Sequence, residues 1–227
     1  MPEPITPSTG WGALHLFCKV GAVADAEAVA SAVKAAQGDE HQVVTFSVLG
    51  HKADVGFLAI GPDLRRLRRL QGGLQAAGLT VVASYVSLTE VSEYAAGMPA
   101  EMLEPRLHPK LPPAGMASIC FYPMSKRRAP GQNWYALPYE QREQLMQGHG
   151  KTGRGFRGRV LQLVTGSTGL DDYEWGVTLF AVHPDDLKDC VYTMRFDEAS
   201  AVYAEFGPFF YGIVGELDEV LKDVWST

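Results

Sequence analysis

The sequence of 227 residues lacks the features that mark several protein classes. Its cysteines, Cys18, Cys120 and Cys190, form no CxxC pair, so neither a disulfide framework nor a covalent haem attachment is expected. The longest strongly apolar run, 206–215, is about half of what a membrane-spanning helix needs. The N-terminus has no basic stretch followed by an apolar run, which a secretory signal requires. These absences predict a cytoplasmic protein without a membrane span.

Positive charge is also scarce. The chain has 20 Lys and Arg residues against 26 Asp and Glu residues, a net charge of −6, so the basic surface that nucleic acids require is not expected. No two of the six histidines have the i, i+4 spacing of a helical zinc site. With 46% hydrophobic and 20% charged residues, the composition is that of a soluble globular protein of one or two domains.

What the sequence does contain is an order of elements that occurs twice. Alternating and helical periodicities in the first half predict the order βαββαβ, which is typical of a ferredoxin-like unit. The expected strands are 12–20, 42–49, 54–60 and 79–89, and the expected helices are 24–37 and 63–78.

A Pro-rich and Gly-containing stretch, Met98 to Gly115, is expected to be a linker to a second such unit. Its expected strands are 117–124, 157–165, 173–181 and 199–206, and its expected helices are 138–148 and 184–194, with a closing helix over 214–224. The predicted fold class is α+β: two tandem ferredoxin-like units whose antiparallel sheets form a barrel-like core. Residues 1–110 are expected to serve structure and assembly, and residues 111–227 to carry the chemistry.

Two apparent nucleotide-binding motifs can be excluded. The run GHGKTG at 148–153 has G-x-G-x-x-G spacing, but a charged helical run precedes it where a dinucleotide-binding loop needs a strand. The first glycine of a phosphate-binding loop would fall on Leu145. The glycines therefore predict the end of a helix.

His149 stands at this expected helix end, between Gly148 and Gly150. Small neighbours would let a large planar group approach its ring. The plainer alternative, which the residues alone favour, is a histidine that interacts with the helix dipole.

Tyr122, Met124 and Lys126 recur at every second position of one strand and should share a face. A phenol, a thioether and an ammonium in a row could perform redox chemistry beside an anion. Equally, they could form a barrel rim where the tyrosine is hydrogen-bonded and the lysine reaches water.

Two further polar side chains have both a functional and a plain interpretation. Gln162 lies on an otherwise apolar strand face, where an unsatisfied amide costs roughly 1–3 kcal/mol, so it should bond either a backbone group or a ligand. Arg195 could pair with the acids at 197–198 on the surface or hold a carboxylate of a ligand.

Four runs of the second half resemble a known family. They are CFYPMSKRR (120–128), NWYALP (133–138), the segment 149–180 and the segment 194–212. They are similar to the chlorite dismutase superfamily and, within it, to the coproheme decarboxylases, over about residues 116 to 213. The resemblance implies a homopentamer of two-unit subunits, with iron coproporphyrin III (coproheme) bound in the C-terminal unit.

The resemblance also implies roles for individual residues. His149 would be the axial iron ligand, Tyr122 the radical that attacks the propionates, Lys126 a propionate partner, and Gln162 the residue over the distal face of the iron. Further porphyrin contacts implied in this way are Met124, Trp134 (an alternative radical site), Arg195 and Ser200.

The implied reaction is oxidative decarboxylation of two propionates by hydrogen peroxide, which yields haem b through a mono-vinyl intermediate. Chlorite-decomposing members have an arginine over the iron, and the neutral Gln162 could not supply its charge. A chlorite dismutase, a peroxidase-like haem enzyme and a non-catalytic tetrapyrrole carrier remain alternatives. A four-carboxylate substrate needs local cations, which Lys126 and Arg195 would provide. A transient contact with coproporphyrin ferrochelatase is one partnership that this reaction allows.

Overall fold

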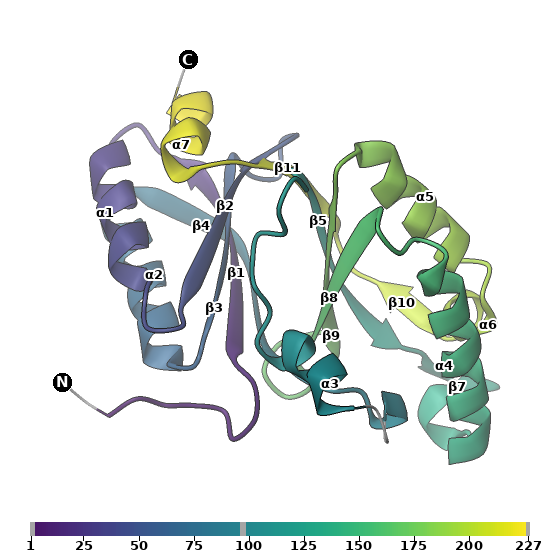
Figure 1. Cartoon of the computed structure of the whole chain (residues 1–227). Helices are drawn as coiled ribbons and strands as arrows, with labels where there is room; N and C mark the ends of the chain where they lie inside the picture. The colour runs from purple at the N-terminus through teal and green to yellow at the C-terminus, as the bar shows by residue number, and fades with distance from the viewer. Residues whose placement is uncertain (1–2, 96–98, 226–227) are drawn as a thin grey trace.

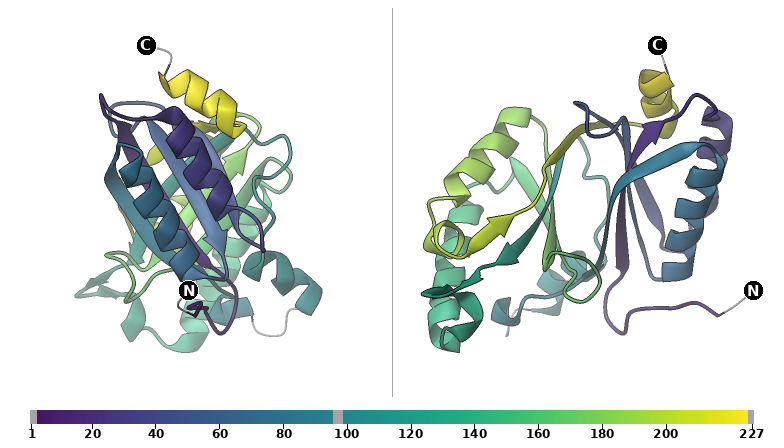
Figure 2. Two further views of the ribbon diagram at one scale, coloured as in Figure 1. Left: turned by 90° about the vertical axis from the view of Figure 1, so that its left-hand side faces the viewer. Right: turned by 180° about the vertical axis from the view of Figure 1, so that it is seen from behind.

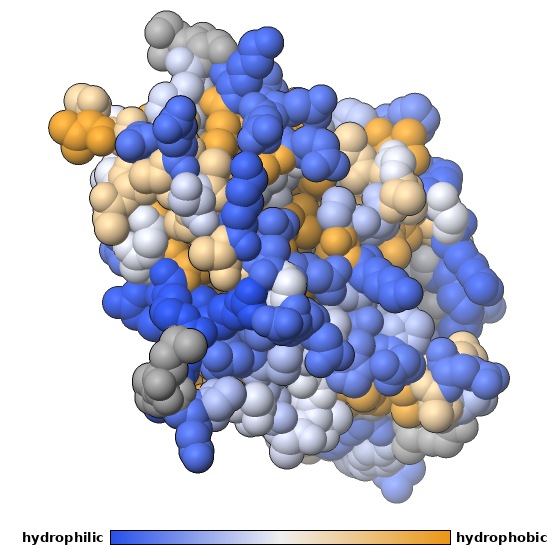
Figure 3. All heavy atoms as spheres, turned by 60° about the vertical axis from the view of Figure 1, so that its left-hand side comes forward, coloured by the Kyte–Doolittle hydropathy of each residue, from blue (hydrophilic) through white to orange (hydrophobic). Residues whose placement is uncertain are grey.

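The computed structural model of the chain describes residues 3–95 and 99–225. Two α+β halves lie side by side, and their sheets join in the centre while helices cover the two outer sides (Figure 1). The side that carries α1 and α2 is mostly hydrophilic, with small scattered hydrophobic patches (Figure 3). Among the described residues, no helix is both long and apolar enough to cross a membrane.

The first half has the predicted βαββαβ order. Its elements are β1 (Gly12–Val20), α1 (Ala26–Ala36), β2 (Gln42–Val48), β3 (Val55–Gly61), α2 (Leu64–Ala76) and β4 (Leu79–Thr89). Each helix begins after an aspartate, Asp25 or Asp63, whose carboxylate accepts hydrogen bonds from backbone N–H groups of the first turn. Apolar residues at helical spacing, such as Val29 and Val33 of α1, then pack onto the sheet.

The second half has the same order with extra short elements. They are β5 (Ser118–Lys126), β6 (Arg128–Ala129), β7 (Gln132–Asn133), η2 (Trp134–Ala136), α4 (Tyr139–Arg154), β8 (Val160–Gly166), β9 (Trp175–Ala181), α5 (Pro184–Met194), α6 (Glu198–Ala201), β10 (Ala204–Phe206), β11 (Phe210–Val214) and α7 (Leu217–Trp225). From behind, α4 and α5 lie on the side opposite α1 and α2 (Figure 2).

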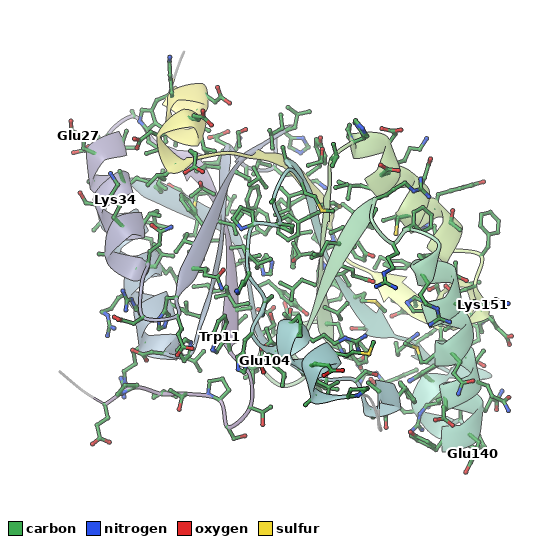
Figure 4. All side chains as sticks on the ribbon, viewed as in Figure 1. Trp11, Glu27, Lys34, Glu104, Glu140 and Lys151 are labelled. Atoms are coloured by element: carbon green, nitrogen blue, oxygen red, sulfur yellow. The ribbon has the colours of Figure 1, made fainter. Side chains whose placement is uncertain are left out.

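The strands of both halves form one sheet that closes on itself. Its order is β10-β5-β11-β2-β3-β1-β4-β8-β9, and an additional pairing of β5 with β9 completes the ring. The halves join along β2 and β11, and more briefly where Leu88 and Thr89 of β4 pair with β8. Side chains from both halves fill the space between the sheets (Figure 4). The predicted barrel-like core is therefore confirmed.

The stretch expected to be a linker contains helical structure. A short helix, η1 (Glu93–Ala95), precedes it, and α3 (Ala100–Leu107) lies within it, although Met98 is outside the described residues. The segment after α3 is held in place by Gln42, which donates to the Pro109 carbonyl and accepts from the Leu111 N–H. These two hydrogen bonds hold the connection against β2.

Two predicted boundaries in the second half are wrong. The helix expected over 138–148 continues through the glycines to Arg154, because contacts with α5 and α6 outweigh the roughly 1 kcal/mol that each internal glycine costs. Glu140 in its first turn and Lys151 in its last complement the helix dipole and point away from the sheet (Figure 4).

The strand expected over 199–206 is also wrong. Residues Glu198–Ala201 form α6, capped by Asp197, and only Ala204–Phe206 is a strand. The following strand, β11, lies in a run that the sequence showed only as continuously apolar, without the alternation that marks a strand.

Candidate porphyrin site

The outer face of β8 is left partly uncovered. Gln162 and Val164 are exposed on it, whereas Leu163 points the other way into the barrel core. Val160, on the same outer face, packs against the cluster that contains Tyr122 and Leu187. Gln162 thus lies on the same face of β8 as Val160, which contacts the Tyr122 cluster, but it does not line the cavity beside His149 and bonds no other group in the described part of the chain.

Tyr122 lies on β5, which is separated from β8 by β9, and its ring lies among aromatic residues. Its side chain is 7% exposed, stacks on Phe209 with ring centroids 4.5 Å apart, and meets the edge of Phe206 at 5.7 Å. Its hydroxyl makes no hydrogen bond to any residue that the structure describes. Burial raises the pKa of Tyr122, so the phenol keeps its proton at neutral pH. Met124 packs against the same cluster, which confirms that these two residues share a face.

Lys126, at the end of β5, is a buried cation. Its Nζ donates to the carbonyl of Ala199 at 2.8 Å and lies 4.2 Å from the centre of the Trp134 ring. No carboxylate of residues 3–95 or 99–225 lies within ion-pair distance of this Nζ. Burial lowers the pKa of Lys126 to about 8, although nearby Asp197 and Glu174 act to raise it. Since an unpaired buried charge is costly, an incoming anion would be bound strongly here.

His149 lies within α4, near its last turn, and is held by residues at the start of α6. Its Nδ1 is 3.1 Å from Oδ2 of Asp197 and 3.4 Å from Oγ of Ser200. Burial acts to raise the pKa of Asp197, but hydrogen bonds from His149 and Ser200 hold that pKa below its ordinary value. The carboxylate accepts the Nδ1 proton, which leaves the lone pair of Nε2 free to bind a metal.

A cavity of about 420 Å³ opens beside His149. It lies between one face of α4 and the start of α6. Its other lining residues are Gln141, Gln144, Leu145, Gly148, Thr152, Asp197 and Glu198. A Cβ added at Gly148 would meet no atom within 4 Å beyond its chain neighbours, so this side of the helix is open. The approach of a planar group to the His149 ring stays a prediction.

Arg195 lies close to the Tyr122 cluster and is available to a ligand. Its guanidinium lies 5.1 Å from the centre of the Phe206 ring. The alternative of a surface ion pair with residues 197–198 is not realised, because Asp197 bonds His149 and Arg195 forms no ion pair in the described part of the chain. Trp134 and Ser200 are both buried. Trp134 contacts Lys126, and Ser200 contacts His149.

Asp197 was not predicted as the partner of His149. The two residues are 48 positions apart, and only the packing of α4 on α6 brings them together. The one available signal was the pattern Asp197–Glu198 before Ser200, which is typical of a helix N-cap. Two phenylalanines contact the Tyr122 ring: Phe206 at the end of β10 and Phe209 in the loop after it. They were not predicted as its neighbours either.

Comparison with known proteins agrees with this geometry. Residues 21–215 match the chlorite dismutase family. A coproheme decarboxylase of Staphylococcus saprophyticus is 42% identical over 191 residues, which cover 80% of this chain and 76% of that protein. A protein of Natronomonas pharaonis described as heme-binding is 44% identical over 191 residues, and these cover 77% of this chain but only 31% of that longer protein.

A solved structure shows the same relationship along almost the whole chain. The heme-binding protein of Thermus thermophilus superimposes with a TM-score of 0.83 and 36% identity, covering 98% of this chain and 99% of that one. The chain therefore belongs to the chlorite dismutase family.

Proposed function

We propose that this protein decarboxylates two propionates of iron coproporphyrin III to vinyl groups, using hydrogen peroxide, and so forms haem b. The observation that carries the proposal is the pairing, on one strand, of a buried phenol with a buried ammonium, where the phenol has no hydrogen-bond partner and the ammonium no carboxylate partner among the residues that the structure describes. Tyr122 can be oxidised and Lys126 can hold an anion. His149 of α4 is linked to Lys126 through α6, where the Ala199 carbonyl accepts from Lys126 and Ser200 contacts His149. Relatives named coproheme decarboxylase match most of the chain and support the same reaction.

The residues present fit an iron porphyrin. Nε2 of His149 would bind the iron, since Asp197 holds the Nδ1 proton. Apolar area for the macrocycle is offered by Tyr122, Met124 and Val164, and Gln162 lies on the same exposed face as Val164. Lys126 and Arg195 supply two cations for propionates, with Ser200 and Trp134 next to them. When bound, the iron supplies oxidising power upon reaction with peroxide.

Tyr122 is the residue that would pass this oxidation to the substrate. It gives up one electron and its phenolic proton, and the phenoxyl radical then takes a hydrogen atom from the propionate carbon next to the ring. Loss of carbon dioxide and of a second electron leaves the vinyl group. Each propionate thus consumes one hydrogen peroxide and one proton and yields one carbon dioxide and two waters. The raised pKa of Tyr122 ensures that the group oxidised is the protonated phenol.

The polar residues around the substrate have separate tasks. Lys126 binds a carboxylate as a point charge, which fixes the adjacent carbon relative to Tyr122. Gln162 has no basic nitrogen, so it can orient peroxide but cannot take its proton. Its neutrality also disfavours chlorite decomposition, which needs a positive charge to retain the chlorine oxyanion.

The division of labour between the halves follows from where these residues lie. Every proposed site residue falls within 111–227, so we assign substrate binding and catalysis to that segment, and structure and assembly to residues 1–110. A homopentamer and a transient contact with coproporphyrin ferrochelatase belong to the same proposal. Both can be tested, by sedimentation of the purified protein and by cross-linking to the ferrochelatase.

The deciding experiment adds ferric coproporphyrin III to the protein, titrates hydrogen peroxide, and follows the porphyrin masses. The proposal predicts two successive losses of carbon dioxide, with the mono-vinyl species appearing first. Oxygen release from chlorite without decarboxylation would instead indicate a chlorite dismutase. Recovery of unchanged coproheme after peroxide treatment would indicate a carrier.

A further inference from the structure

Four aromatic side chains connect the site to the protein surface. Trp134 and Tyr203 are buried and meet edge to face, with ring centroids 5.4 Å apart. Tyr94 of η1 packs against the cluster formed by this pair and Ala199, and it stacks on Tyr139 with ring centroids 5.8 Å apart. Tyr139, the first residue of α4, is 39% exposed. These four residues, termed the aromatic path below, lead from a buried to an exposed position.

The inner end of the aromatic path touches the site. The Trp134 ring lies 4.2 Å from Nζ of Lys126, and that Nζ donates to the carbonyl of Ala199. The next residue, Ser200, contacts His149. Trp134 is therefore only a few contacts from the proposed iron ligand, and indole and phenol side chains are among the most easily oxidised groups in a protein.

The outer part of the path can also handle protons. Oxidation of a tyrosine at neutral pH requires its phenolic proton to leave, so an acceptor must be in place. The hydroxyl of Tyr94 accepts from Nε of Arg142 at 3.0 Å. Arg142 in turn lies 3.7 Å from the Glu93 carboxylate. Burial raises the pKa of Tyr94, as does the nearby Glu93 carboxylate, so the phenol stays protonated until it is oxidised.

We propose that the aromatic path carries oxidising equivalents from the bound porphyrin to Tyr139, where small thiols are oxidised. This inference rests on the haem binding of the proposed function. One hydrogen peroxide takes up two electrons and two protons to give two waters. Both electrons are supplied by thiols and enter through Tyr139: its phenoxyl radical takes a hydrogen atom from a thiol in each of two rounds, and the two thiyl radicals combine to a disulfide. The path thus gives the protein a second activity, consumption of peroxide when no propionate remains to be decarboxylated.

The chain offers a matched control outside the path. Tyr192 at the end of α5 is more exposed than Tyr139 and also contacts another ring, that of Phe196, at 5.1 Å. It does not belong to the Trp134 cluster. If exposure alone decided which tyrosine is oxidised, Tyr192 would be the favoured one.

The test uses the full chain loaded with haem b, treated with hydrogen peroxide in the presence of a nitroso spin trap, and peptide mapping by mass spectrometry. The expected result is a trap adduct on Tyr139. That adduct should be lost in Tyr139→Phe and strongly reduced in Tyr94→Phe and Tyr203→Phe, which keep the rings and the packing. Tyr192→Phe should leave it unchanged.

Two results would overturn the path. One is an adduct on Tyr139 at full yield in the Tyr94→Phe, Tyr203→Phe double variant. The other is an adduct on Tyr192 or Tyr135 in place of Tyr139. A parallel assay of coproheme decarboxylation separates this inference from the proposed function, since Tyr139→Phe should still produce haem b. Trapping at Tyr139 without any decarboxylation would contradict the proposed function alone, and failure to bind haem would contradict both.

Discussion

Oδ2 of Asp197 lies 3.1 Å from Nδ1 of His149, and the other oxygen of the same carboxylate accepts the N–H of Ser200 at the start of α6. One side chain therefore both orients the proposed iron ligand and caps the helix that packs against it. This double role ties the geometry of the proposed metal site to the local fold.

Replacing Asp197 with Asn should weaken iron binding. The amide is neutral, so the hydrogen bond to His149 loses its charge assistance, and loss of such a partner typically lowers metal affinity by roughly tenfold to a hundredfold. Titration of the protein with ferric coproporphyrin III, followed by absorbance, measures the effect. Glu198→Gln is the control, because its carboxylate lines the same cavity without contacting His149. Equal affinities for both variants would refute the positioning role.

Lys126 should make porphyrin binding depend on pH. With a pKa of about 8, Lys126 is charged below this pH and neutral above it, and a bound carboxylate raises that pKa. The complex therefore holds more protons than the free protein, and affinity should fall above pH 8 by up to about tenfold per pH unit.

Metal-free coproporphyrin III, whose fluorescence reports binding, allows this measurement without turnover. In Lys126→Met the affinity should be lower and the step above pH 8 should vanish. Lys34→Met, on α1 at the far side of the molecule, should retain the step. A step that persists in Lys126→Met would place the titrating group elsewhere.

His15 should make the fold sensitive to acid. It is fully buried in the barrel, where Nε2 bonds Oγ1 of Thr178 at 2.8 Å and Nδ1 has no partner within the described residues. Burial lowers its pKa to about 3, whereas the unfolded chain binds the proton near its ordinary pKa of 6.5. Stability from this group is thus present above pH 6.5 and is lost as the pH falls toward 3.

Urea unfolding measures the loss. Between pH 7 and pH 5 the free energy of unfolding should fall by about 2 kcal/mol from this residue alone. His15→Gln should remove that share of the pH dependence, even though it is less stable at pH 7. His51→Gln, at an exposed turn, should behave like the unmodified protein. An unchanged pH dependence in His15→Gln would contradict the assignment.

The sequence was most informative where periodicity is strong and local. The alternation of β1 and the spaced leucines of α2 predicted elements that the structure places within a few residues. The shared face of Tyr122 and Met124 followed in the same way, because a strand's side chains alternate whatever it packs against.

Features that depend on packing between distant segments could not be predicted. Nothing local in α4 shows that it continues past Gly148, since the contacts that stabilise its last turns come from α5 and α6. The short α6 has too few residues for a periodic signal, and without it Asp197 cannot be placed beside His149. The carbonyl of Ala199 as the partner of Lys126 depends on the same helix.

One experiment decides whether Tyr122 performs the oxidation. Hydrogen peroxide is added to the Tyr122→Phe variant loaded with coproheme, and the porphyrin masses are followed. The variant keeps the ring that packs on Phe209 but lacks the hydroxyl, so coproheme should bind with nearly unchanged affinity. Tyr211→Phe, in the same cluster on β11, is the matched control and should yield haem b like the unmodified protein. No loss of carbon dioxide is expected from the Tyr122→Phe complex. Two losses of carbon dioxide at the rate of the unmodified protein would contradict this role of Tyr122.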